Sequence, residues 1–89
     1  MIKDEQIASY LHALSHPVRL EIVQELLKGP KNVSEVQHAL KISQANTSQH
    51  LSVLRFNGVV GCTKKGTIKV YSLKEPEKIH CIMAILIGE

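Results

Sequence analysis

The chain has 89 residues, a mass of 9.9 kDa and a formal net charge of +3, with 44% hydrophobic and 21% charged residues. This length leaves room for a single domain over residues 1–89 and excludes a Rossmann or barrel enzyme. No apolar run approaches the roughly 20 residues that span a bilayer, and the two cysteines are too few for a disulfide scaffold. We therefore expect a cytoplasmic protein with no membrane partner.

The acidic residues are unevenly distributed along the chain. None of the eight occurs between Glu35 and Glu75, a stretch of 39 residues that holds six of the eleven lysines and arginines. A long acid-free stretch in a small folded domain is typical of a surface that faces the phosphates of a nucleic acid.

Two helices are predicted in the first third of the chain. Ile7, Leu11 and Leu14 recur at helical spacing and define a short first helix. A second helix begins at Ser-His-Pro, residues 15–17, where a small polar cap precedes a proline in the first turn. It ends at the Gly-Pro pair of residues 29–30.

A third helix follows directly. Asn32 and Glu35 have the spacing of a capping box, in which each side chain binds the backbone amide of the other residue. A tight turn over residues 41–43 ends this helix. Its buried side is expected to consist of Val33, Val36 and Leu40.

The fourth helix is predicted from Gln44, with Ser43 as its cap, to about Asn57, and Gly58 suits the left-handed position that ends it. With the third helix it forms a helix-turn-helix over residues 33–57. The side opposite its core face is small, polar and free of acidic residues. The core face is predicted to be Thr47, Leu51 and Leu54.

Beyond the fourth helix the hydrophobic period changes to that of strands. Residues 59–63 and 68–73 predict two antiparallel strands, joined by the basic turn Lys-Lys-Gly-Thr at residues 64–67. The two strands form a basic wing over residues 59–73.

A last helix is predicted over residues 76–87, beginning at a proline. Its run from Cys81 to Ile87 is apolar on all sides, so two of its faces must be buried. One face can cover the helix's own domain, and a second copy of the chain is the expected cover for the other. The predicted fold is therefore mainly α with a small β-hairpin wing, a winged helix-turn-helix of five helices and two antiparallel strands.

The outward side of the fourth helix suits the major groove of double-stranded DNA. Glutamine and asparagine can form paired hydrogen bonds with adenine, and Gln44 and Asn46 lie in the first helical turn, from which base edges are reached. Short hydroxyl side chains often contact phosphate oxygens, and the candidates for this role are Ser43, Thr47 and Ser48. The alternative is an ordinary solvated helix face.

The chain resembles the ArsR-type family of bacterial and archaeal winged-helix repressors in three segments. These are LHALSHPVRLEIVQELL at residues 11–27, VSEVQHALKISQANTSQHLSVLRFNGVV at residues 33–60, and KKGTIKVYSL at residues 64–73. The pattern SQxxxSQHLxxL, from Ser43 to Leu54, is similar to the recognition-helix signature of that family.

The resemblance implies a homodimeric repressor on a palindromic operator, with the first and last helices as the dimer interface. It adds His50 to the DNA-facing residues, and Lys64, Lys65 and Thr67 at the wing tip. For Arg19, a phosphate contact and a structural ion pair are equally open. The full set of predicted DNA-binding residues is Ser43, Gln44, Asn46, Thr47, Ser48, Gln49, His50, Arg55, Lys64, Lys65 and Thr67.

A sensing site is not evident, and no cofactor is expected. The Cys-x-Cys motif with which many members of the family bind metals is absent from residues 31–36. Glu77, His80 and Cys81 share one face of the last predicted helix and could supply metal ligands. The favoured reading is a solvated Glu77, an interfacial His80 and a buried Cys81, because the second histidine group of the family is missing. Cys62 and Cys81 could be a redox pair or two small buried hydrophobic residues.

The sequence thus predicts a sequence-specific double-stranded DNA-binding transcriptional regulator that acts as a homodimeric repressor. The alternative is a winged-helix module for protein interaction or DNA architecture, without an inducer. No Ser-His-Asp or Cys-His arrangement suggests catalysis, so the protein is not expected to be an enzyme.

Overall fold

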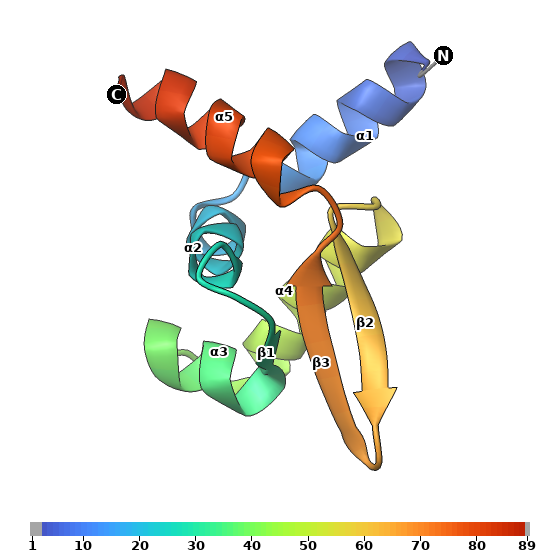
Figure 1. Cartoon of the computed structure of the whole chain (residues 1–89), viewed down its shortest axis with the longest axis vertical. Helices are drawn as coiled ribbons and strands as arrows, with labels where there is room; N and C mark the ends of the chain where they lie inside the picture. The colour runs from blue at the N-terminus through green and yellow to red at the C-terminus, as the bar shows by residue number, and fades with distance from the viewer. Residues whose placement is uncertain (1–2, 89) are drawn as a thin grey trace.

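The computed structural model describes residues 3–88, which form five helices and a three-stranded antiparallel sheet (Figure 1). This is the predicted winged helix-turn-helix architecture with one additional strand. The elements in chain order are α1 (Asp4–Leu14), α2 (Pro17–Leu26), β1 (Lys31–Asn32), α3 (Val33–Leu40), α4 (Gln44–Phe56), β2 (Val60–Lys65), β3 (Ile68–Leu73) and α5 (Pro76–Ile87).

The ends of α3 are defined by local hydrogen bonds and by one unusual backbone conformation. The Asn32 side chain accepts from the Glu35 amide at 2.8 Å, and the Glu35 carboxylate accepts from the Asn32 amide at 2.9 Å, which confirms the capping box. The helix ends where Lys41 adopts a left-handed conformation with φ of 57°. This residue turns the chain from α3 into α4.

The caps of α4 also agree with the sequence pattern. The Ser43 hydroxyl accepts a hydrogen bond from the Asn46 amide at 3.1 Å, and Gly58 follows the helix with φ of 78°. Thr47, Leu51 and Leu54 are fully buried, as the helical spacing predicted. The recognition helix therefore presents its remaining, polar side to solvent.

The sheet differs from the prediction in two respects. The prediction of two strands was wrong because Lys31 and Asn32 pair with Tyr71 and Val70 of β3, which makes the strand order β1-β3-β2. A strand of two residues has no alternating pattern that a sequence could display. The second difference is that β2 continues to Lys65, so that the wing turn shrinks to two residues.

The wing turn is now Gly66 and Thr67. Gly66 has φ of 64°, a conformation that a two-residue hairpin turn requires and that glycine adopts without steric cost. Lys64 and Lys65 therefore belong to a strand, where the ladder holds their backbone, and not to a loose turn. This stiffens the base from which their side chains project.

The hydrophobic core joins all five helices to the base of the wing. It contains residues from α1, α2, α3, α4, the two long strands and α5, and the helix-turn-helix packs directly on α2. Its largest fully buried side chains include Ile22, Leu51, Leu54, Ile79, Val23, Val36, Val59 and Val60.

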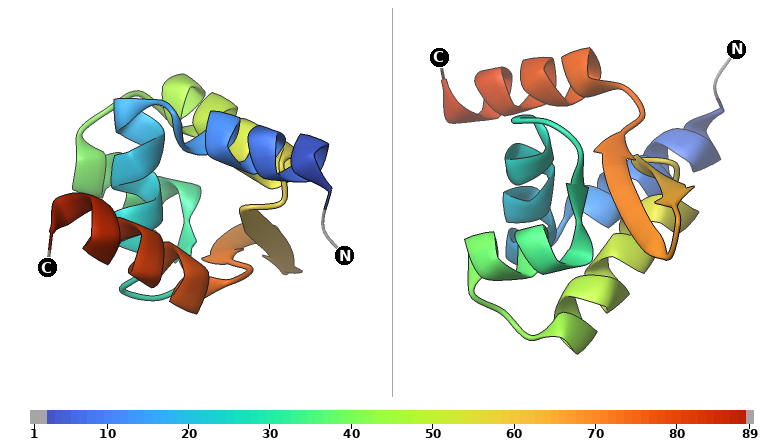
Figure 2. Two further views of the ribbon diagram at one scale, coloured as in Figure 1. Left: turned by 90° about the horizontal axis from the view of Figure 1, so that it is seen from above. Right: turned by 60° about the horizontal axis from the view of Figure 1, so that its bottom comes forward.

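The two ends of the molecule are formed by different elements. Figure 1 shows α1 and α5 diverging at one end, while the β2–β3 hairpin projects toward the opposite end. The turned views in Figure 2 show α5 lying across the end of the domain beside α2, with α3 and α4 on the far side. None of the helices found in residues 3–88 has the length and apolar character needed to cross a membrane.

Candidate nucleic-acid interface

The solvent-facing side of α4 is polar and free of acidic residues. Gln44, Asn46, Gln49 and Arg55 are exposed on it. Ser43 caps the helix through the Asn46 amide, and all three residues of the first turn, 44–46, are exposed. A face of this kind can enter the major groove, since neither bulk nor negative charge opposes its approach to DNA.

The assignment of Thr47 to the DNA-binding set was wrong. Thr47 has no exposed surface, and its hydroxyl donates to the Ser43 carbonyl oxygen at 2.8 Å. The helical spacing had already placed this residue on the core face, and the packing of α4 decides between the two readings. Ser48, one position further, is half-buried at the margin of the outward face.

His50 and Arg19 belong to a polar cluster between α4 and the start of α2. Arg19 Nη1 lies 3.3 Å from His50 Nδ1, and the His50 ring lies 4.6 Å from the His16 ring, centroid to centroid. Arg19 Nε also donates to the Ala13 carbonyl oxygen at 2.7 Å, at the end of α1. Both side chains are half-buried, so His50 packs within the fold, and its contact with DNA stays a prediction.

The contacts of Arg19 differ from the ion pair that was one of its two predicted roles. Within residues 3–88 Arg19 forms no ion pair, and its structural partners are a carbonyl oxygen and an imidazole nitrogen. A phosphate contact of Arg19 stays a prediction. Burial, and then the neighbouring His16 and Arg19, lower the pKa of His50 below the usual value for histidine. The neutral form of His50 is therefore favoured in the folded protein.

The wing presents a group of lysines to solvent. Lys64 and Lys65 are exposed on β2, Thr67 is exposed in the turn, and Lys69 of β3 lies directly opposite Lys64. Like charges at opposed positions of a strand pair destabilise each other, so this hairpin gains when an anion lies against it. The predicted set omitted Lys69, although its place in the acid-free stretch was a usable signal.

Nothing in the described part of the chain neutralises these lysines. The two ion pairs within residues 3–88 join Lys28 to Glu25 on α2, and Lys78 to Glu75 at the start of α5, at 3.0 and 2.9 Å. Both lie outside the α4 and wing surface. The positive charge of the wing is thus available to a partner.

At the opposite end, α1 and α5 share an uncovered apolar surface. Between them lies a cavity of about 240 Å³, lined mainly by apolar side chains: Ile7, Tyr10, Leu11, Lys78 and Ile82. Ile85 and Leu86 extend this surface along α5 and are 78% and 71% exposed. Only the Ile79 side of α5 is fully covered by the domain itself, as expected for a helix that is apolar on all sides.

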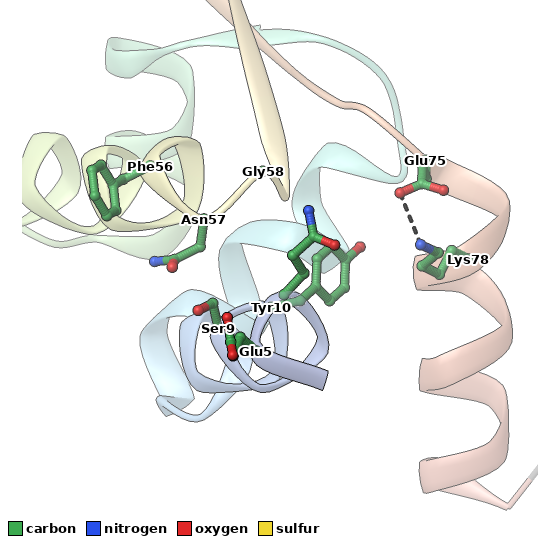
Figure 3. A pocket seen from close by; sticks show the side chains of 9 residues that line it. Glu5, Ser9, Tyr10, Phe56, Asn57, Gly58, Glu75 and Lys78 are labelled. Carbon is green, nitrogen blue, oxygen red and sulfur yellow. Dashed lines mark hydrogen bonds and ion pairs between the residues drawn. The ribbon is translucent and has the colours of Figure 1, made fainter. Parts of the chain in front are cut away.

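A second, more polar hollow of about 450 Å³ lies on the other side of α1, between α1, the end of α4 and the start of α5. Figure 3 shows Tyr10 pointing from α1 toward α5, where Glu75 and Lys78 pair, while Phe56 and Asn57 lie across the hollow. The Tyr10 hydroxyl is buried and lacks a hydrogen-bond partner among residues 3–88. Lys78 Nζ lies 5.2 Å from the centre of the Tyr10 ring.

The residues considered for sensing are not brought together in the protomer. Within residues 3–88, no three histidine, cysteine, aspartate or glutamate side chains form a group that could hold a metal ion, and Glu77, His80 and Cys81 are all exposed on α5. Cys62 and Cys81 are free thiols. Cys62 is half-buried opposite Tyr71, and Cys81 is exposed on α5 in the single protomer, so the two readings of these cysteines stay open.

Comparison with known proteins gives a consistent result. The family model described as "Bacterial regulatory protein, arsR family" matches residues 16–61. The chain is 35% identical to the "Biofilm growth-associated repressor" of Xylella fastidiosa over 80 residues, which are 90% of this chain and 70% of that protein. It is 36% identical to the "Transcriptional repressor PagR" of Bacillus anthracis over 83 residues, which are 92% of this chain and 82% of that protein.

Solved structures agree in fold over nearly the whole chain. HlyU from Vibrio cholerae superposes with a TM-score of 0.84 at 29% sequence identity and covers 100% of both chains. The crystal structure of PagR superposes with a TM-score of 0.80 at 34% identity and covers 91% of this chain and 93% of that chain. These similarities include the helix-turn-helix, the wing and the two terminal helices.

Proposed function

The chain belongs to the arsR family of bacterial regulatory proteins, and from this premise we infer that it is a transcriptional repressor that binds double-stranded operator DNA as a homodimer. The proteins named as repressors among its relatives match it over most of its length. This chain's own surface supports the same function independently.

One observation carries the proposal. The exposed side of α4 and the adjoining hairpin together form a polar, positively charged surface in a stretch of chain without any acidic residue. Chance alone could leave residues 36–74 without an acidic residue. In the fold, however, this stretch also includes the helix that fits a major groove and the hairpin beside it.

The residues on this surface divide into two chemical groups. Gln44 and Asn46, in the first turn of α4, have the amide groups that read base edges. The wing lysines, and Arg55 further along α4, offer positive charge without base preference. We assign sequence readout to the first group and affinity for phosphates to the second.

The homodimer is assigned to α1 and α5. The protomer leaves Ile85, Leu86 and the α1 residues Ile7 and Leu11 exposed around one apolar cavity. A second copy related by a twofold axis would cover this surface with the same residues from its own helices. It would also hold two recognition helices at a fixed separation, as the two halves of a palindrome require.

The test begins with the DNA itself. Duplexes bound by the protein are selected from a random library, and fluorescence anisotropy then gives the affinity for the selected duplex and for a scrambled duplex of equal length. Both are measured at 50 and 200 mM salt. We expect a palindromic preference, a specific affinity at least about a thousandfold above the non-specific one, and a steep salt dependence.

Two results would overturn the proposal. Equal affinity for selected and scrambled duplexes would identify an architectural protein without sequence readout. No binding to any duplex at either salt concentration would remove DNA as the partner, and the wing lysines would then need another anionic partner.

A further inference from the structure

The Arg19, His16 and His50 cluster defines the protonation state of both imidazoles. Arginine can only donate hydrogen bonds, so His50 Nδ1, at 3.3 Å from Arg19 Nη1, must accept. His16 Nδ1 accepts from the Val18 amide at 3.1 Å and thereby caps the first turn of α2. Each ring therefore needs an unprotonated Nδ1, which means that both histidines are neutral in this arrangement.

The cluster joins three helices that meet behind the recognition surface. Arg19 of α2 holds the end of α1 through the Ala13 carbonyl and holds α4 through His50. The contact between Arg19 and His50 spans 31 positions of sequence. Thr47 and Leu51, the buried neighbours of His50 on α4, complete the seating of this helix.

Resting on the proposed DNA-binding function, we propose that Arg19, His16 and His50 are positioning residues for the recognition helix, and that proton uptake by His50 releases α4 from the seating that specific operator binding requires. The residues act through α4 and need not touch DNA.

The charges around the cluster all act in one direction. The groups that act on His50 are His16 and Arg19, both at the start of α2, while α1 contributes the uncharged Ala13 carbonyl. No carboxylate in residues 3–88 pairs with any of the three side chains. If His50 were protonated, its Nδ1 could no longer accept from Arg19, and its positive charge would lie beside the Arg19 guanidinium. A positive charge on His16 would lie at the N-terminal, positive end of the α2 dipole.

The direction of the pH effect follows from these charges. His50 of the unfolded chain takes up its proton near the ordinary histidine pKa of about 6.5, whereas burial and the neighbouring His16 and Arg19 lower the pKa of His50 in the folded protein. The stabilisation is therefore fully present above about pH 6.5 and is lost as the pH falls below it. Added positive charge alone would have the opposite effect on DNA, because it would strengthen binding to every duplex.

The experiment measures affinity for the selected operator and for the scrambled duplex at constant ionic strength between pH 7.5 and 5.5. We expect the ratio of specific to non-specific affinity to fall by about tenfold or more over this range. The double variant His16→Asn/His50→Gln retains a capping side chain and an acceptor that do not titrate, and its ratio should stay within about twofold. The matched control, His38→Gln on the exposed side of α3, should keep the full pH response.

A second measurement uses the unmodified protein without DNA, so its result does not depend on whether the double variant folds. In the unmodified protein, NMR titration of the His50 ring protons should show that His50 accepts a proton at lower pH than an ordinary histidine, whose pKa is about 6.5. The proposal is overturned if the affinity ratio is independent of pH, or if the double variant keeps the response, or if the pKa of His50 is not lower than the ordinary histidine value. Absence of operator binding at pH 7.5 would instead contradict the DNA-binding function, while the titration would still test the cluster.

Discussion

The two ends of this small domain are incomplete in opposite ways. The α4 and wing end presents lysines and amides that form no ion pair within residues 3–88, and Lys64 stands opposite Lys69 across the hairpin. The α1 and α5 end presents apolar side chains, of which Ile85 and Leu86 are mostly exposed. One end lacks a negatively charged partner, and the other lacks an apolar one.

The difference indicates which partner is permanent. Exposed apolar surface is costly at every moment in water, so the α1 and α5 end is expected to be covered for the whole life of the folded protein. Exposed lysines are well solvated, so the other end can be covered or bare. A stable dimer with reversible DNA binding follows from this contrast, and four substitutions test it.

The largest effect is expected from Ile85→Asp at the apolar end. Ile85 is 78% exposed in the protomer, so the change should leave the protomer folded but would bury unpaired charge in the dimer. We expect the dimer dissociation constant to rise at least about a hundredfold, roughly 3 kcal/mol. Analytical ultracentrifugation measures it, with Gln24→Asp on the exposed side of α2 as the control. An unmodified protein that sediments as a monomer at micromolar concentration would remove the basis of the comparison.

The second effect is expected from Gln44→Ala at the polar end. If its amide forms paired hydrogen bonds with adenine, the loss should be about 1–3 kcal/mol per half-site and should be confined to one base position. Affinities for operators with single base changes measure this, with Ser52→Ala on the same exposed side of α4 as the control. A uniform loss over all operators would assign Gln44 to the DNA backbone.

A smaller and different effect is expected from Lys65→Ala. Because it contributes charge without base preference, its removal should weaken specific and non-specific binding alike. The slope of log affinity against log salt should decrease by about one per protomer. Lys28→Ala, which removes a lysine paired with Glu25 on α2, should leave the slope unchanged. An unchanged slope together with altered base preference in Lys65→Ala would move this residue to the readout group.

The smallest effect is expected from Tyr10→Phe at the apolar end. The Tyr10 hydroxyl is buried and has no hydrogen-bond partner among residues 3–88, so removing it should leave stability unchanged or raise it by up to about 1 kcal/mol. Thermal unfolding measures this, with Tyr71→Phe as the control for loss of a phenol group. A clear loss of stability would mean that the hydroxyl finds its partner in the dimer, and would extend the interface to this side of α1.

The elements of this fold were largely predictable because their signals are local. The capping box of Asn32 and Glu35, the Ser43 cap and the left-handed Gly58 each act within a few residues, and each is found as predicted. The strand of Lys31 and Asn32 was not predictable, since its only support is a distant partner strand.

The exposed residues of the candidate DNA-binding site were predictable from the sequence, but the contacts that hold α4 in place were not. Helical spacing gave the outward face of α4, but it could not decide for Thr47 between a phosphate contact and the core, which depends on how closely α4 packs. The roles of Arg19 and His50 depend on a contact between residues 31 positions apart. The sequence around Arg19 and the sequence around His50 contain no pattern that predicts this contact. The positioning role of the two residues can therefore be inferred only from the folded structure.

The short strand β1 has a consequence for how the domain opens. Lys31 pairs with Tyr71, forty positions later, and the whole helix-turn-helix and the first wing strand lie between them. Closing a loop of that length costs on the order of 3 kcal/mol of chain entropy, so we expect this ladder to form late and to open together with the segment that it encloses. Amide hydrogens in the β1–β3 ladder should therefore exchange with solvent water at the rate of cooperative opening of the helix-turn-helix and wing together, and not at the rate of fraying at a strand end.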